Sequence, residues 1–206
     1  LDPRSALYFG IVLNVIAFAL LASSVNLLAA LLTLSATVFY VFVYTGWLKR
    51  TSTQNIVIGG AAGAIPPLVG WAAITGNIGL PAIYLFAIVF FWTPPHFWAL
   101  ALLIKNDYKK ASVPMLPVVS GEKATAWGIM LHLIILVSLT ILFFTIDIVG
   151  LLYLFGAIIL AIIFVCMAFR LLLSGGTKGA RSLYLYSLSY LFFLFILIMV
   201  DSVTNF

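Results

Sequence analysis

Charged side chains are scarce in this chain of 206 residues: they make up 7% of it, whereas hydrophobic residues make up 65%. Soluble domains carry about 25% charged residues. A soluble fold of this length has too little interior to enclose so much apolar surface. The composition therefore excludes a water-soluble domain and indicates that lipid surrounds the chain. In such a chain the net charge of +5 reflects membrane topology and does not indicate a nucleic-acid partner.

Cysteine is almost absent too, and the single Cys166 excludes a disulfide framework, so we interpret it as a small packing residue. The start of the chain lacks the charged end, short apolar run and small-residue cleavage site of a signal peptide. It does not begin with Met, and Leu1-Asp2-Pro3-Arg4 is typical of the middle of a loop. We therefore expect a fragment whose N-terminal part is absent.

Long apolar runs dominate what is present. A membrane-spanning helix needs about 20 mostly apolar residues, and the runs that meet this length are separated by short polar segments. The sequence thus predicts an all-α fold: a polytopic bundle of about seven transmembrane helices in one domain over 1–206. The seven runs are 5–24, 27–46, 55–75, 80–104, 124–146, 148–172 and 182–203.

The basic residues are distributed asymmetrically between the loops. All ten fall in or beside alternate loops, and the opposite loops contain Asp147 and Asp201 but no Lys or Arg. An excess of Lys and Arg marks the cytoplasmic side of a membrane protein. We expect this side to face the cytoplasm or the equivalent compartment of an organelle. The residues are Arg4, Lys49, Arg50, Lys105, Lys109, Lys110, Lys123, Arg170, Lys178 and Arg181.

Two polar segments on the basic side could carry chemistry. The first ends the second run and holds Tyr44 beside Lys49 and Arg50, with Asn55 one turn into the next run. It is either an interfacial anchor of aromatic and basic residues or a diphosphate site, since adjacent cations beside a phenol suit that anion.

The second segment is Lys105–Lys110, followed by the stiff apolar stretch Val113–Pro117. Asp107 lies there among cations that include Lys109. Two interpretations stay open: a solvated ion-pair cluster, or a carboxylate that helps to bind Mg²⁺, which takes one or two carboxylates plus substrate phosphates.

Two further segments lie within apolar runs. Phe91–Trp98 holds Pro94, Pro95 and His96 between tryptophans. An ionisable group at that depth is a candidate site residue, and the alternative is a histidine hydrogen-bonded to a neighbouring helix. The stretch Gly59–Pro67 combines small residues, which allow close helix packing, with two prolines that kink the helix.

These segments resemble the protoheme IX farnesyltransferases, or heme O synthases, of the UbiA superfamily of intramembrane prenyltransferases. The resemblance covers essentially the whole chain and includes Tyr44–Thr51, Ile58–Trp71, Trp92–Ala101 and Asp107–Pro117. The family has nine spanning helices, so this chain would contain the last seven. The first two would carry an Asn-Asp-x-x-Asp-x-x-x-Asp motif, the main Mg²⁺-diphosphate site, and this chain alone is expected to be inactive. Family members usually have an acidic residue where Asn106 stands and Gly where Ser112 stands.

The resemblance implies transfer of a farnesyl group from farnesyl diphosphate to a vinyl group of heme B, giving heme O, with Mg²⁺ assisting diphosphate departure. It implies a bacterial inner membrane, or the mitochondrial inner membrane in a eukaryote, and association with heme A synthase or terminal oxidase assembly. Carried over residue by residue, the resemblance suggests catalytic roles for Tyr44, His96 and Asp107, and metal contacts from Asp107 and Asn106. It suggests diphosphate contacts from Lys49, Arg50, Asn55 and Lys109. A heme or prenyl pocket would be formed by Trp92, Pro94, Pro95, His96 and Trp98.

Functions of the same and of other classes are the alternatives. A related prenyltransferase could use a quinone or chlorophyll precursor, although the Thr93–Trp98 and Pro114–Pro117 motifs favour heme. A rhodopsin needs a Lys in its last helix, and 182–203 has none. An ion pathway would need several intramembrane carboxylates, but Asp147 and Asp201 lie at span ends. A non-catalytic seven-helix transporter or structural subunit is the distant alternative.

Overall fold

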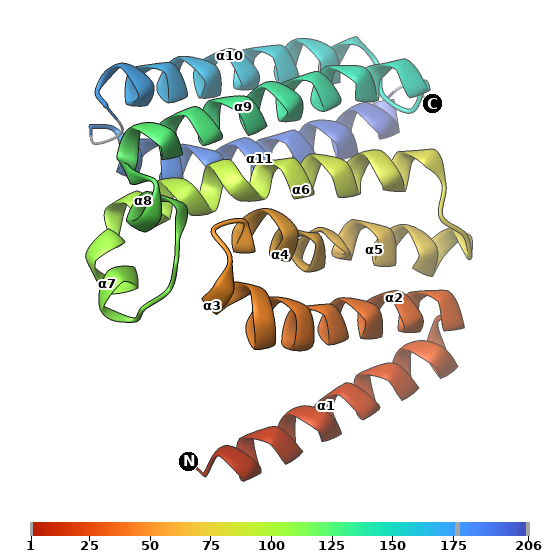
Figure 1. The fold of residues 1–206 in the computed structure, drawn as a ribbon. Coiled ribbons are helices and arrows are strands. Elements are labelled where there is room, and N and C mark those ends of the chain that lie inside the picture. Colours follow the sequence, from red (N-terminus) through yellow and green to blue (C-terminus); the bar gives the residue numbers. More distant parts are fainter. Residues whose placement is uncertain (1, 176–177, 205–206) are drawn as a thin grey trace.

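The computed structural model describes residues 2–175 and 178–204, and every element in that part is helical. The helices are α1 (Pro3–Ser24), α2 (Leu27–Val38), the π-helix η1 (Phe39–Leu48), α3 (Lys49–Thr51), α4 (Asn55–Ala64), α5 (Pro66–Thr75), α6 (Leu80–Leu103), α7 (Lys105–Lys110), α8 (Leu116–Val119), α9 (Gly121–Leu142), the 3₁₀ turn η2 (Phe143–Ile146), α10 (Leu151–Leu173) and α11 (Ala180–Thr204). The long segments that these helices form run back and forth across the bundle, so that consecutive segments point in opposite directions (Figure 1).

Seven of these segments are long and apolar enough to cross a membrane, which confirms the predicted helical bundle. Large apolar side chains on their outer faces are exposed, and Ile74 is the extreme case at 88%. Water would oppose such exposure, but lipid tails do not. The chain is therefore a multi-pass membrane protein. The spans are Arg4–Ser24, Leu27–Thr51, Asn55–Thr75, Leu80–Leu103, Gly121–Ile146, Leu151–Leu173 and Ala180–Thr204.

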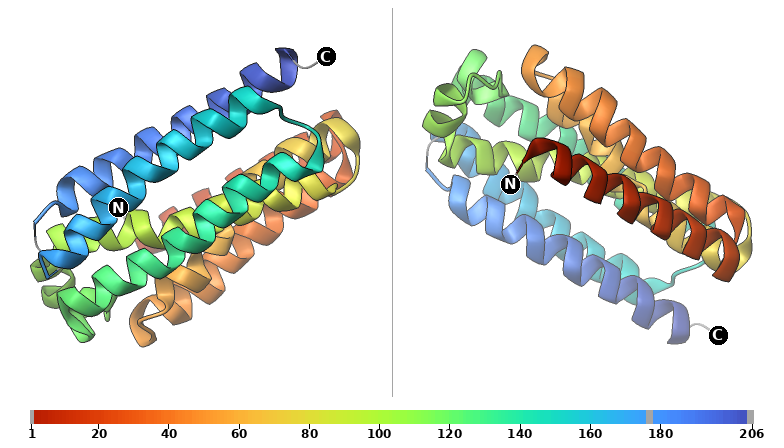
Figure 2. Two further views of the ribbon diagram at one scale, coloured as in Figure 1. Left: turned by 90° about the horizontal axis from the view of Figure 1, so that it is seen from above. Right: turned by 90° about the horizontal axis from the view of Figure 1, so that it is seen from below.

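Helix α6 is the centre of the packing. It contacts α4 and α5 on one side and α9 and α11 on the other, and α10 packs against both α9 and α11. The π-helix η1 packs on α4, α2 packs on α5, and α1 packs on α2 at the edge of the bundle (Figures 1 and 2). The buried core lies mainly among α6, α9, α10 and α11.

The start of the chain departs from the loop expected at Leu1–Arg4. Leu1 lies outside the described residues, but α1 begins at Pro3, and the Asp2 side chain accepts a hydrogen bond from Arg4 N at 3.2 Å. Proline suits the first turn of a helix, where its missing N–H would have had no partner. The predicted break at 174–181 also lies partly outside the described residues, which omit 176 and 177.

The two Pro-Pro pairs behave differently. The kink predicted at Pro66-Pro67 coincides with the point where α4 ends at Ala64 and α5 begins at Pro66. Helix α6, in contrast, continues through Pro94 and Pro95, which are both buried. The prolines remove the amide donors that would have bonded the carbonyls four residues earlier. Because the pair is enclosed by protein, α6 tolerates this loss inside a membrane.

Alternating direction brings all ten basic residues to one end of the bundle. The turns at α3 and at α7–α8, the start of α1 and the α10–α11 connection all lie at that end, which is at the left of Figure 1. We call it the basic end. Asp147 and Asp201 lie at the opposite end, where Asp201 is buried and accepts a hydrogen bond from Gly150 N.

The segment 105–119 forms a cap over the basic end of α6 and α9. Val113, Met115 and Pro117 are buried, and α8 packs on both long helices. Lys105 Nζ and Glu122 Oε1, 3.2 Å apart, link the start of the cap to α9. The segment is therefore a packed structure that closes this end of the two helices.

Replacing Ser112 by glycine is expected to stabilise the protein by about 0.5–1 kcal/mol. Ser112 has a φ of +54°, a left-handed conformation that costs an L-residue energy but glycine almost none. Thermal unfolding of the detergent-solubilised protein measures the effect. Ser120→Gly is the control, because Ser120 has a φ of −100° and glycine there should not stabilise. Equal shifts in the two variants would contradict this explanation.

Candidate active site

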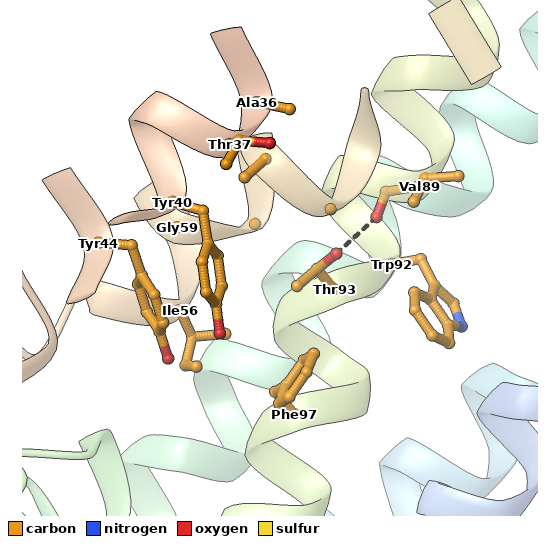
Figure 3. A pocket seen from close by; sticks show the side chains of 13 residues that line it. Ala36, Thr37, Tyr40, Tyr44, Ile56, Gly59, Val89, Trp92, Thr93 and Phe97 are labelled. Carbon is orange, nitrogen blue, oxygen red and sulfur yellow. Dashed lines mark hydrogen bonds between the residues drawn. The ribbon is translucent and has the colours of Figure 1, made fainter. Parts of the chain in front are cut away.

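A cavity of about 450 Å³ opens between η1, α4 and α6, with α2 at its far side. Its wall is almost wholly apolar, apart from two phenols and two threonine hydroxyls (Figure 3). Such a space suits a long apolar substrate with one polar end. It is lined by Ala36, Thr37, Tyr40, Tyr44, Ile56, Gly59, Gly60, Ala62, Gly63, Val89, Trp92, Thr93 and Phe97.

Tyr44 and Tyr40 stand side by side on the wall of this cavity. Their ring centroids are 5.2 Å apart, and both hydroxyls point the same way in Figure 3. The π-helix produces this pair, since both residues lie in η1. Wide π turns within α-helices occur frequently at functional sites. The sequence singled out Tyr44, and the structure adds Tyr40 as its neighbour.

Glycines allow the cavity walls to approach so closely. A Cβ on Gly59 would lie 2.3 Å from Tyr44 Cδ2, and one on Gly60 would lie 3.0 Å from Thr93 Cγ2. The Gly59 position therefore lets the Tyr44 ring lie flat against α4, and the Gly60 position brings α4 against α6. The small residues predicted to allow close packing do so next to the site.

Asn55 is the first residue of α4 and has an unusual environment. Its side chain is fully buried, and neither amide atom has a hydrogen-bond partner among the described residues. The next residue, Ile56, lines the cavity. A buried polar group without a partner costs about 1–3 kcal/mol, so such groups require an explanation. A polar group of a bound ligand would explain the buried Asn55 amide, and this agrees with the diphosphate contact predicted for Asn55.

The predicted charged residues lie at the basic end on two short helices. Lys49 is half-buried and Arg50 exposed on α3, while Asn106, Asp107 and Lys109 are exposed on α7. Figure 1 shows both helices at this end of the bundle.

Tyr108 of α7 is half-buried and packs against the hydrophobic core. Burial raises the pKa of the Tyr108 hydroxyl. The phenol therefore remains protonated at neutral pH and can donate a hydrogen bond. The sequence motif contains Tyr108, but nothing in the sequence indicated that its phenol is half-buried.

The carboxylate of Asp107 is free to bind a cation. Among the described residues the one ion pair joins Lys105 and Glu122. Asp107 therefore forms no ion pair there, and the ion-pair interpretation of this residue does not hold. The same residues contain no group of three His, Cys, Asp or Glu side chains that could hold a metal. A single carboxylate such as that of Asp107 could share Mg²⁺ with a substrate diphosphate, because Mg²⁺ accepts one or two carboxylates plus phosphates.

His96 lies beside the cavity but does not line it. Its imidazole is buried, stacks on Trp92 with centroids 4.3 Å apart, and makes a 2.7 Å hydrogen bond through Nδ1 to Ser187 Oγ of α11. Trp92 lines the cavity, and its indole N–H donates to Ser187 O at 2.8 Å. Sequence reasoning missed Ser187, although a serine within an apolar run is the kind of signal that marks a helix–helix contact.

The other predicted pocket residues lie deeper in the bundle. Pro94 and Pro95 are buried within α6 and do not line the cavity. Trp98 is buried against Gly128 of α9, where a Cβ would lie 2.9 Å from its ring. The structure therefore brings Tyr44, Gly59 and Trp92 together around one space and leaves Trp98 in the α6–α9 interface.

Known proteins match the chain over nearly its whole length. The protoheme IX farnesyltransferase of Gloeobacter violaceus is 52% identical over 202 residues, which cover 98% of this chain and 66% of that protein. The Nostoc sp. protein of the same name is 53% identical over 97% of this chain and 63% of its own length. The Roseiflexus sp. protein of the same name is 52% identical over 96% of this chain and 37% of its own length.

The chain thus spans between about a third and two thirds of the length of these relatives. No solved structure matches it significantly. The model of one family, described as the UbiA prenyltransferase family, matches residues 1–197. This match covers the first six spanning helices, most of the seventh and every residue of the candidate site. The chain therefore belongs to the UbiA prenyltransferase family.

Proposed function

We propose that this chain is part of a heme O synthase, which transfers a farnesyl group from farnesyl diphosphate to a vinyl group of heme B. The cavity carries the proposal: an apolar space with paired phenols on its wall, next to the basic end. The relatives named protoheme IX farnesyltransferase support heme as the acceptor.

In this proposal the diphosphate binds at the basic end. The allylic C–O bond breaks and the diphosphate leaves with the electron pair, while the π electrons of the vinyl group form the new C–C bond. Water from the solvent then adds to the carbocation left on the former vinyl group and releases a proton, which gives a hydroxyl group there. Lys49 and Arg50 stabilise the developing negative charge, because two adjacent cations suit a bound diphosphate. The Asn55 amide and the Lys109 ammonium donate to the phosphate oxygens, and the neutral Tyr44 phenol donates to the leaving oxygen.

Mg²⁺, held by Asp107 and the diphosphate with Asn106 nearby, would neutralise further charge on the leaving group. The farnesyl tail occupies the cavity, where apolar walls keep water from the allylic carbon. Further ligands would come from the part of the protein outside this chain. The basic end would face the cytoplasm of a bacterium, or the matrix if the membrane is mitochondrial, where heme A synthase or the terminal oxidase could receive the product.

Lys49→Ala in the full-length protein is expected to raise the KM for farnesyl diphosphate. A lost hydrogen bond to a charged group is worth about 1.5–3 kcal/mol, which corresponds to roughly ten- to hundredfold in affinity. The assay incubates the purified protein with heme B and farnesyl diphosphate and measures the product by mass.

The control is Lys178→Ala, which removes an exposed cation at the same end but beside α11. Its KM should remain that of the wild type. An unchanged KM in Lys49→Ala would remove this residue from the diphosphate site, and a product mass other than farnesylated heme would overturn the proposed reaction. Full activity in excess chelator would defeat the metal proposal.

A further inference from the structure

Ser187 is a buried hydroxyl that joins α11 to two functional side chains of α6. It is fully buried. Its hydroxyl donates to Tyr184 O at 2.6 Å, and its carbonyl accepts the Trp92 indole N–H at 2.8 Å. The same hydroxyl oxygen lies 2.7 Å from His96 Nδ1. Ser187 therefore contacts both Trp92, which lines the cavity, and His96, the only buried ionisable side chain among the described residues of α6.

These bonds determine the tautomer of His96. A serine hydroxyl has one proton, and Ser187 uses it to bond the Tyr184 carbonyl. The oxygen must then accept a hydrogen bond from His96, so Nδ1 carries the imidazole proton. In a neutral imidazole only one nitrogen is protonated. The lone pair is therefore on Nε2.

The rings around His96 fix its orientation. Trp92 stacks on one face at 4.3 Å with an interplanar angle of 18°, and the Tyr184 ring lies 4.9 Å away at 31°. Phe97 meets the imidazole edge-on, at 5.2 Å and 89°. Nε2 makes no hydrogen bond with a described residue, and it is not among the fully enclosed polar atoms that lack a partner. The lone pair thus has no partner among the described residues.

We propose that Ser187 is a positioning residue that holds His96 in the Nδ1–H tautomer and thereby presents Nε2 as an axial ligand for heme iron. Neutral imidazole is the commonest metal ligand, and ligating histidines almost always bond a partner through the other nitrogen. Heme needs only one axial imidazole from the protein, so a three-residue metal cluster is not required. The inference rests on the proposed use of heme.

The tautomer can be measured directly by ¹⁵N NMR of the full-length protein, labelled at histidine and assigned by difference from His96→Gln. In the wild type Nδ1 should resonate as a protonated, pyrrole-type nitrogen and Nε2 as an unprotonated, pyridine-type nitrogen. In Ser187→Ala this assignment should be lost or reversed, and Ser187→Thr should restore it. A wild-type spectrum with the proton on Nε2, or an unchanged tautomer in Ser187→Ala, would overturn the inference.

Heme binding tests the second part of the proposal, that Nε2 of His96 binds heme iron. Titration with heme B, followed by visible absorption, should give an axial-imidazole spectrum for the wild type and roughly 10–100-fold weaker binding for Ser187→Ala. The control Ser189→Ala changes an exposed serine of the same helix and should leave the affinity unchanged. Normal heme affinity in Ser187→Ala would overturn the role for Ser187. Failure of the wild type to bind heme would overturn the proposed function and the heme part of this inference together.

Discussion

Replacing Gly59 by alanine is expected to lower the rate of prenyl transfer by about 100-fold. The new Cβ would lie 2.3 Å from Tyr44 Cδ2 and 2.8 Å from its Cε2, so the ring has to move. Misplacing a positioned group by about 1 Å can cost roughly 10²-fold in rate. Overpacking should also destabilise the fold by about 1–3 kcal/mol. Product formation by the full-length variant, compared at equal folded protein, measures the effect on the rate.

Gly70→Ala is the matched control for this experiment. Gly70 lies in α5, outside the residues that line the cavity, and a Cβ there has no atom within 4 Å. Its rate and stability should stay close to those of the wild type, within about 0.5 kcal/mol. If Gly59→Ala retained the wild-type rate, Tyr44 would not be needed where the structure places it, and the candidate site would have to move along the cavity.

The sequence predicted the spanning helices well because one physical requirement determines them. Lipid cannot satisfy backbone polar groups, so each apolar run of sufficient length must be a helix. The break at Ile65 was also predictable, since Pro66 starts a new helix there. Ser112, noted as a departure from the usual glycine, proves to have a positive φ. This positive φ explains why family members usually have glycine at the position of Ser112, since glycine adopts it almost without cost.

The details of the site could not be predicted, because they depend on which helix faces meet. The run 27–46 gave no sign that Phe39–Leu48 is a π-helix, yet this segment sets the spacing of Tyr40 and Tyr44. Ser187 is one serine among several in its run, and its importance appears only when α11 packs against α6. The sequence placed His96 in a pocket, whereas aromatic packing and a hydrogen bond hold it beside one.

Asp107→Asn is expected to reduce prenyl transfer by roughly 10²–10³-fold, the loss typical when one group that stabilises transition-state charge is removed. The side chain is exposed and makes no ion pair with a described residue, so its charge is not needed for folding. Asparagine keeps the shape but weakens metal binding, and excess Mg²⁺ should recover part of the rate. Steady-state product formation at several metal concentrations measures both effects.

Asp147→Asn provides the comparison, because it removes an exposed carboxylate from the opposite end of the bundle. Asp147 has a φ of +57°, which asparagine also tolerates, so the fold should be unaffected. A wild-type rate in Asp147→Asn with a large loss in Asp107→Asn would localise the metal chemistry to the basic end. Wild-type rates in both variants would instead leave α7 as a solvated surface, and the metal ligands would have to be sought outside this chain.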